Sequence, residues 1–143
     1  GWAATEALTG EAGADLLEGG AGNDALTGGS GADRLVGGAG ADQFVLASIG
    51  DSQAGAFDVI ADFSRGDRDK IGLSAIDANV NQAKDQKFAF IGTAEFGGVA
   101  GQLRYEQVDG NTFVEGDTNG DGTADFVIQL TGLINLGASD FGL

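Results

Sequence analysis

Four aspartates recur at intervals of nine residues: Asp15, Asp24, Asp33 and Asp42. A large apolar residue stands two positions after each of them, in the order Leu17, Leu26, Leu35 and Phe44. Regularly spaced carboxylates are oxygen ligands of the kind that hard divalent cations prefer. The 143 residues include no His and no Cys, which are the usual ligands of zinc, copper and iron–sulfur clusters. The spacing therefore predicts a series of sites for a hard cation.

Glycines surround each aspartate in the same register. The first and fourth positions of the units 10–18, 19–27, 28–36 and 37–45 are Gly10 and Gly13, Gly19 and Gly22, Gly28 and Gly31, and Gly37 and Gly40. The second position is Gly20, Gly29 or Gly38, but Glu11 in the first unit. The units match G-G-x-G-x-D-x-U-x, where U is a large apolar residue, which is the known consensus of a calcium-binding β-helix repeat. A flexible acidic linker would share this composition but not the regularly placed apolar residues.

This repeat predicts an all-β fold built as a right-handed parallel β-roll. The last three residues of each unit form a short strand whose central side chain points inward, and the first six form a loop in which glycine permits positive φ. Two units complete one coil of a flattened spiral, and successive coils stack ~4.8 Å apart. Asp15 is then stacked on Asp33, and Asp24 on Asp42.

Stacked carboxylates need a counter-charge. Two of them about 5 Å apart repel each other by ~3 kcal/mol at an effective dielectric constant of 20. A divalent cation between two loops, bound by carboxylate and carbonyl oxygens, turns this repulsion into attraction. Calcium is favoured over magnesium because flexible glycine-rich loops offer more oxygens than an octahedral magnesium ion accepts. We therefore expect several Ca²⁺ ions.

The net charge of the chain limits the classes of partner that it can bind. The net charge is −15, from 22 acidic and 7 basic residues, and there are 27 glycines. Such a chain is expected to collapse poorly without calcium. Nucleic acid is an unfavourable partner because its phosphates would meet a surface of like charge. No apolar run approaches the ~20 residues of a transmembrane helix, so membrane insertion is not expected.

The period ends at Val45, which divides the chain into a predicted roll at 1–45 and a β-rich capping region at 46–143, together one continuous module. Residues 1–9 resemble a decayed unit, with Glu6 at the aspartate position and Leu8 at the inward position. Beyond the roll, Asp109-Gly110 is a hairpin turn signal. Alternating apolar patterns predict strands at 57–63, 69–74, 88–91, 102–106, 112–114 and 125–130. We expect these strands to form an antiparallel, sandwich-like cap over the exposed end of the spiral.

Two further acidic groups are candidate calcium ligands. Asp51 and Asp58 follow the last repeat, where the Asp42 loop still needs a partner, although solvated turn carboxylates explain them equally well. Residues 117–125 match the first nine positions of an EF-hand loop, but Ile128 replaces the bidentate Glu and the flanks are predicted strands. An Asx-rich turn between two strands is favoured there over a partial calcium loop.

Beyond the repeats, the sequence resembles the C-terminal RTX domain of serralysin-type metalloproteases and of related proteins exported by type I secretion. The residues that carry the resemblance are Phe44-Val45-Leu46, Asp51-Ser52, 58–63, 66–71, Leu73-Ser74, 116–130 and the terminal Asp140-Phe141-Gly142-Leu143. The resemblance implies that this C-terminal end is part of an uncleaved export signal, so that 46–143 is a secretion region as well as a cap. It also implies calcium binding by the carboxylates of Asp15, Asp24, Asp33, Asp42, Asp51 and Asp58 and by the loops at Gly13, Gly20, Gly22, Gly29, Gly31, Gly38 and Gly40. Gly72 and Gly142 depart from the family pattern.

Two functions follow as hypotheses. The first is a non-catalytic module of a secreted, extracellular protein. It is exported unfolded by an ABC transporter, folds on binding calcium, and supports an upstream catalytic domain that is expected to be a hydrolase such as a metalloprotease. The second is a calcium-dependent module that binds an acidic polysaccharide or a cell surface, for which the candidate basic residues are Arg34, Arg65, Arg68, Lys84, Lys87 and Arg104. Without histidines the chain cannot form the serralysin zinc site, so no enzyme activity of its own is expected.

Overall fold

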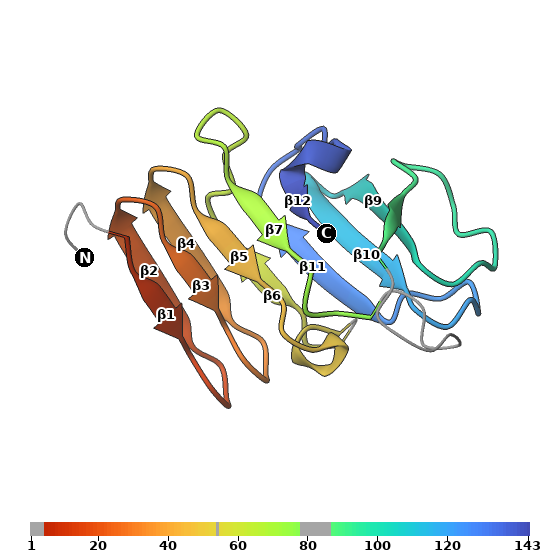
Figure 1. The fold of residues 1–143 in the computed structure, drawn as a ribbon, viewed down its shortest axis with the longest axis horizontal. Coiled ribbons are helices and arrows are strands. Elements are labelled where there is room, and N and C mark those ends of the chain that lie inside the picture. Colours follow the sequence, from red (N-terminus) through yellow and green to blue (C-terminus); the bar gives the residue numbers. More distant parts are fainter. Residues whose placement is uncertain (1–4, 54, 78–86) are drawn as a thin grey trace.

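Residues 5–53, 55–77 and 87–143 are described by the computed structural model, in which two β-sheets share one hydrophobic core (Figure 1). The five-stranded sheet has the order β1 (Ala7–Thr9), β3 (Ala25–Thr27), β5 (Gln43–Val45), β7 (Lys70–Gly72) and β12 (Phe141–Gly142). The seven-stranded sheet has the order β2 (Leu16–Ala21), β4 (Arg34–Ala39), β6 (Asp58–Ile60), β11 (Phe126–Leu130), β10 (Asn111–Asp117), β9 (Gln102–Val108) and β8 (Ala89–Phe90). Short 3₁₀ turns form η1 (Ile49–Asp51) and η2 (Ala138–Asp140). Lys84 lies outside the described residues.

The predicted coil of two nonapeptides is confirmed by the strand register. Strand β2 pairs with β4 in parallel, with Leu17 opposite Leu35, and β3 pairs with β5, with Leu26 opposite Phe44. Both offsets are eighteen residues. The decayed first unit follows the same rule, because Leu8 of β1 stands opposite Leu26. The parallel β-roll predicted from the repeat is therefore the architecture of this half of the chain.

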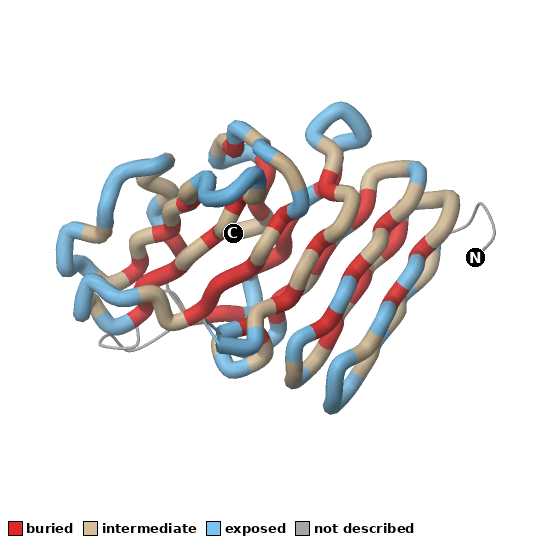
Figure 2. Tube along the Cα trace, turned by 180° about the vertical axis from the view of Figure 1, so that it is seen from behind, coloured by how far each residue is buried: buried red, intermediate tan, exposed pale blue. Residues whose placement is uncertain are grey.

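The inward apolar residues form one ladder on each sheet. On the five-stranded sheet, Ile71 stands between Phe44 and Phe141, so the ladder of the repeats continues into β7 and β12. On the other sheet, Ile60 continues the ladder of Leu35 and stands opposite Leu130. These residues are buried in a single core, and Figure 2 shows the buried positions as bands across the strands, with most of the loop segments more exposed.

The second half covers the end of the roll by extending both of its sheets. Strand β6 adds to β4 and β7 adds to β5, each in parallel, so the segment 57–74 supplies a further coil rather than the predicted antiparallel cap. Among the strands of the described residues, the antiparallel pairs are β9 with β10 and β10 with β11, and the predicted hairpin at Asp109-Gly110 joins the first pair. No helix among the described residues is long and apolar enough to cross a membrane.

Close stacking of the loops gives a test of the roll. Gly38 has a φ of 90°, and a Cβ at this position would overlap the Gly20 carbonyl oxygen of the preceding coil. Gly132 has a φ of 96°, but a Cβ there would meet nothing within 4 Å. We predict that Gly132→Ala costs about 1–2 kcal/mol of folding free energy, from backbone strain alone. Gly38→Ala should cost more than about 3 kcal/mol, because a loop must also move.

The two variants are compared by urea unfolding in saturating calcium. Equal losses of stability in both would show that the loops of adjacent coils are not packed against each other.

Candidate metal centre

The aspartates of the repeats are held by backbone hydrogen bonds between adjacent coils. The Asp15 amide donates to Oδ1 of Asp33 over 2.8 Å, and the Asp24 amide donates to Oδ1 of Asp42 over 2.9 Å. The Glu6 amide donates in the same way to Oδ1 of Asp24. Each of these acceptors is almost fully buried, with 2% of its surface exposed. The predicted stacking of Asp15 on Asp33 and of Asp24 on Asp42 is thus observed.

The two stacks continue beyond the repeats. The Asp33 amide donates to Oδ1 of Asp58, and the Asp42 amide donates to Oδ1 of Asp69, both over 2.9 Å. We call Asp15, Asp33 and Asp58 the first aspartate column. The second aspartate column consists of Asp24, Asp42 and Asp69. The expectation that Asp58 completes the Asp42 loop is wrong: Asp58 pairs with Asp33, and Asp69 pairs with Asp42, because the chain adds one strand to each sheet in turn.

Four carboxylate oxygens in these columns lack a partner. The Oδ2 atoms of Asp15, Asp24, Asp33 and Asp42 are buried and have no hydrogen bond within the described part of the chain. An anionic oxygen that is buried and unpaired costs several kcal/mol unless a cation or donor meets it. The four atoms occupy equivalent places in successive loops. This orphaned set is the strongest sign of a cation site in the structure.

Backbone carbonyls meet these oxygens in cradles formed at glycine. At Gly19, the place where a Cβ would stand lies 2.5 Å from Oδ2 of Asp24 and 2.7 Å from the carbonyl oxygen of Gly37, in the next coil. At Gly10, the same place lies 2.8 Å from Oδ2 of Asp15 and 2.5 Å from the Gly28 carbonyl oxygen. Carboxylate and carbonyl oxygens from two coils therefore converge where a side chain is absent. Such a set of hard oxygens fits calcium.

The loop glycines that were predicted to bind calcium lie between adjacent coils. The carbonyl oxygen of Gly20 lies against Gly38, and that of Gly22 lies against Gly40. The carbonyl oxygen of Gly13 lies against Gly31 in the same manner. Gly29 lies against the carbonyl of Glu11, which occupies the second position of the first unit with a φ of 82°. Each of the seven glycines is thus in the stack of loops that contains the aspartates.

Asp51 lies near the first aspartate column, to which Asp58 belongs, whereas the sequence analysis placed both residues at the Asp42 loop. Burial raises the pKa values of Asp33 and Asp58, and negative charge on Asp51 adds to both shifts. The Ser52 hydroxyl positions this segment, because it accepts a hydrogen bond from the Asp58 amide and donates to the Val127 carbonyl in β11.

Two acidic residues escaped the sequence analysis. Asp69 is buried, with Oδ1 bound to the Asp42 amide and Oδ2 bound to the Ser64 amide. Asp62 accepts from the Gly37 and Gly38 amides through its two carboxylate oxygens. Both residues close the last loop of the second column. The sequence offered one signal for these two residues, namely that they flank the turn at 64–67. Because this turn lies beyond the nonapeptide repeats, the period of nine did not identify them as members of the stack.

The loop at 117–125 joins β10 to β11 through hydrogen bonds of the Asx type. Oδ1 of Asp117 accepts from the Gly120 amide and Oδ2 accepts from the Gly122 amide, while Asp125 accepts from both the amide and the hydroxyl of Thr118. These bonds support the predicted Asx-rich turn. The carboxylates of Asp117, Asp121 and Asp125 come within 4.8 Å of one another and could hold a metal ion.

Burial makes four of the column aspartates resist ionisation. It raises the pKa of Asp42 to about 6 and that of Asp58 to about 7, and it also raises the pKa values of Asp33 and Asp69. Neighbouring carboxylates add to the effect: Asp69, Asp24 and Asp62 for Asp42, and Asp33 and Asp51 for Asp58. At neutral pH the ionised carboxylates therefore destabilise the folded chain, and a bound cation would neutralise their charge.

The profile of the family described as peptidase M10 serralysin C terminal matches residues 13–142. No curated protein gives a significant match. Solved structures similar to this chain include two subunits of the mannuronan C5-epimerase of Azotobacter vinelandii.

The two similarities extend over nearly the whole chain. The AlgE6R3 subunit is 28% identical, with 99% of this chain and 74% of that chain covered and a TM-score of 0.66. The AlgE6R2 subunit is 30% identical, with 96% of this chain and 87% of that chain covered and a TM-score of 0.63.

Raised pKa values predict how the metal-free chain responds to acid. Between the ordinary aspartate pKa of 3.8 and the values of about 6 and 7, the folded state binds more protons than the unfolded state. Folding stability therefore falls as pH rises through this window, and the folded fraction should increase when pH is lowered from about 7.5 to about 5.5. Far-UV circular dichroism in metal-stripped buffer measures this change.

Asp58→Asn is the matched control, since an amide resembles the protonated acid. This variant should fold better than the wild type at neutral pH without metal and should respond less to acid. A wild-type folded fraction that decreases on mild acidification would contradict the burial of these carboxyl groups.

Proposed function

The chain belongs to the peptidase M10 serralysin C-terminal family, and we propose that it serves a larger exported protein as a non-catalytic module that folds on binding calcium. Its family and its similarity to the two epimerase subunits support a calcium-binding RTX module. The single observation that carries the proposal is the row of buried, unpartnered Oδ2 atoms in the repeats.

The proposed calcium ligands follow from the two columns. The carboxylates are those of Asp15, Asp24, Asp33, Asp42, Asp51 and Asp58, to which we add Asp69. The loops contribute at Gly13, Gly20, Gly22, Gly29, Gly31, Gly38 and Gly40. Calcium held between two loops would supply the positive charge that the stacked carboxylates lack. Several ions are expected, because the orphaned oxygens recur in four successive loops.

Calcium dependence of folding follows from the balance of forces in the chain. A net charge of −15 and 27 glycines oppose collapse, through self-repulsion and backbone entropy. Since the site exists only when coils are stacked, the free energy of calcium binding is available for folding. Extracellular calcium modules bind with dissociation constants of about 10⁻⁴–10⁻³ M, so the chain would stay unfolded in calcium-poor cytosol and fold outside the cell.

The C-terminal end supports a role in export before folding. Its proposed signal, residues 140–143, overlaps β12, which pairs with β7, and Phe141 is buried in the core. These residues would be accessible for binding by an exporter only while the chain is unfolded. The proposed partners are accordingly a type I (ABC transporter) secretion system and an upstream catalytic domain, with the mature protein extracellular. The serralysin family makes a hydrolase, such as a metalloprotease, the favoured parent.

A calcium titration with paired variants tests the proposal. Wild-type protein in chelator should show little β-structure by far-UV circular dichroism and should gain it as calcium is added. Asp33→Asn should raise the calcium midpoint by at least about tenfold, which corresponds to ~1.4 kcal/mol, because it removes a negative charge from the first column. Asp69→Asn should act in the same direction in the second column.

Asp109→Asn is the control. Asp109 is exposed in the β9–β10 turn, so this substitution removes the same charge at a place away from the columns. Its midpoint should stay within about twofold of the wild type. Full β-structure in chelator, or equal shifts in Asp33→Asn and Asp109→Asn, would refute the proposed role of the columns.

A further inference from the structure

The outer face of the seven-stranded sheet carries a row of side chains that crosses six of its strands. Alternate side chains of a strand point to opposite faces of a sheet, so the neighbours of the buried core residues point outward. The strand pairing puts these outward residues side by side in the order Leu16 (β2), Arg34 (β4), Val59 (β6), Gln129 (β11), Phe113 (β10) and Glu106 (β9). The row therefore has a cation on one side of its centre and an acid on the other.

The centre of the row is an apolar surface. Val59 and Phe113 are only half-buried. Phe113 packs edge to face against Phe57, which is half-buried too, with the ring centroids 5.6 Å apart. Partly exposed aromatic side chains in the middle of a polar surface are typical of protein–protein interfaces. The three central strands β6, β11 and β10 thus offer an apolar centre to a partner.

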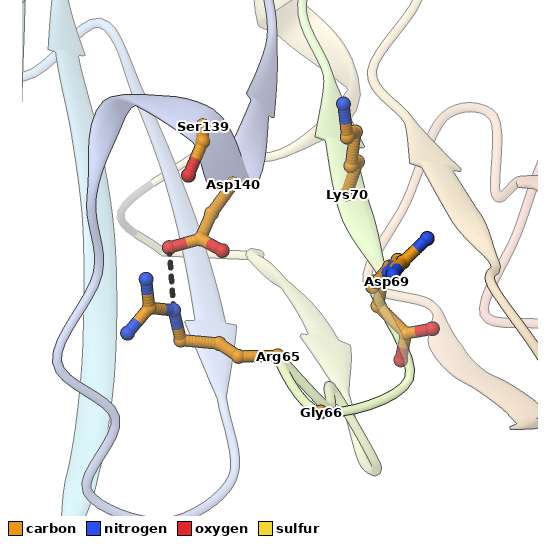
Figure 3. A pocket seen from close by; sticks show the side chains of 7 residues that line it. Arg65, Gly66, Asp69, Lys70, Ser139 and Asp140 are labelled. Atoms are coloured by element: carbon orange, nitrogen blue, oxygen red, sulfur yellow. Dashed lines mark ion pairs between the residues drawn. The ribbon is translucent and has the colours of Figure 1, made fainter.

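Arg34 is a cation without a partner in its own chain. It is exposed and forms no ion pair within the described ranges. By contrast, Nε of Arg65 is paired with Oδ2 of Asp140 at 2.8 Å (Figure 3). Arg68 and Lys70 are also exposed and unpaired in the described part of the chain, but they belong to the segment of β7, in the other sheet. A partner that fits the outer face must therefore present an acid to Arg34.

The far side of the same face is acidic. A hollow of about 390 Å³ is lined there by three carboxylates, those of Glu95, Glu106 and Glu115, and by one cation, Arg104. Arg104 is shared between two of them, since it pairs with Glu115 and, at 3.6 Å, with Glu106. Burial raises the pKa of Glu115, and the charge of Glu106 adds to the shift. The hollow has an excess of negative charge and can accept a further cation.

A second copy of the chain supplies both complements at once. Strand β11 is the central one of the seven, with β4 two strands away on one side and β9 two strands away on the other. A two-fold axis along β11 would stack the outer faces of two copies about 10 Å apart, as in a β-sandwich. It would set Arg34 of each copy against Glu106 of the other, and Val59 against Phe113. The charged pair would then occur twice around an apolar centre, as a self-complementary interface requires.

We propose that the folded chain forms a two-fold dimer through the outer faces of its seven-stranded sheets, with Arg34 of each copy paired with Glu106 of the other. Within one chain these two residues are four strands apart, or ~19 Å, so they can pair only between copies. The net charge of −15 opposes association, but salt screens charges separated by more than about 8 Å, which leaves the close pairs to decide. This inference goes beyond the proposed function and needs only the folded chain.

Sedimentation equilibrium in saturating calcium and about 0.15 M salt measures the dimer. Arg34→Glu and Glu106→Arg should each weaken dimerisation at least about tenfold, because each sets two pairs of like charges against one another. An equimolar mixture of the two variants should recover the dimer, because both contacts of the mixed dimer again join opposite charges. Recovery on mixing can arise only from contacts between copies.

Arg68→Asp is the matched control. It makes the same change of charge as Arg34→Glu, on an exposed residue that leads into β7 of the other sheet. Asp suits this position because the backbone has a φ of 69°, a left-handed value that Asp tolerates. The control should change the dimerisation constant less than about threefold.

Three results would overturn the inference. A monomeric wild type would leave the outer face to some other partner. Equal weakening by Arg34→Glu and Arg68→Asp would show a general effect of charge, and a mixture of folded variants that stays monomeric would exclude the proposed pairs. Calcium titration by circular dichroism checks that each variant folds. If Glu106→Arg does not fold, the comparison of Arg34→Glu with Arg68→Asp decides alone, because Arg34 is exposed.

Discussion

Buried aspartates in this protein use their two carboxylate oxygens differently, and the whole roll depends on that division. Oδ1 accepts a hydrogen bond from the amide of the preceding coil, so it fixes the register between coils. Oδ2 of the four repeat aspartates is buried and has no hydrogen-bond partner among the described residues. Stacking the coils therefore creates sites of unmet negative charge, and at neutral pH a bound cation would remove the penalty. The interaction that gives the coils their spacing also creates the need for calcium.

The remainder of the fold completes what the repeats begin. The apolar ladders supply the usual hydrophobic driving force, but each coil contributes only one large inward residue per sheet. A core this thin cannot by itself offset the entropy of a glycine-rich chain. Past the repeats, the chain keeps both ladders and both aspartate columns going, through Ile60 and Asp58 on one side and Ile71 and Asp69 on the other. The C-terminal strand then closes the five-stranded sheet.

Periodicity made much of this predictable. Once Asp15, Asp24, Asp33 and Asp42 were aligned on nine-residue units, the coil length, the inward residues and the stacking of the aspartates followed from strand geometry alone. The prediction weakened where the period ended. Asp58 and Asp69 stand 25 and 27 residues after their partners instead of 18, so the inserted turns concealed their places in the columns. The parallel pairing of β6 and β7 could not be predicted either, because an alternating apolar pattern indicates a strand but not the direction in which it pairs. The C-terminal segment folds back to pair with β7, which local sequence does not reveal.

Long-wavelength anomalous diffraction from crystals of the calcium-loaded protein tests the central claim most directly, because it locates calcium by element. We predict anomalous peaks between successive loops, each within about 2.3–2.6 Å of the Oδ2 atom of a repeat aspartate. A further peak is expected where the Asp42 loop meets Asp69. A well-ordered roll with no anomalous scatterer beside these oxygens would contradict the account, because the buried carboxylates would then be stable without a cation.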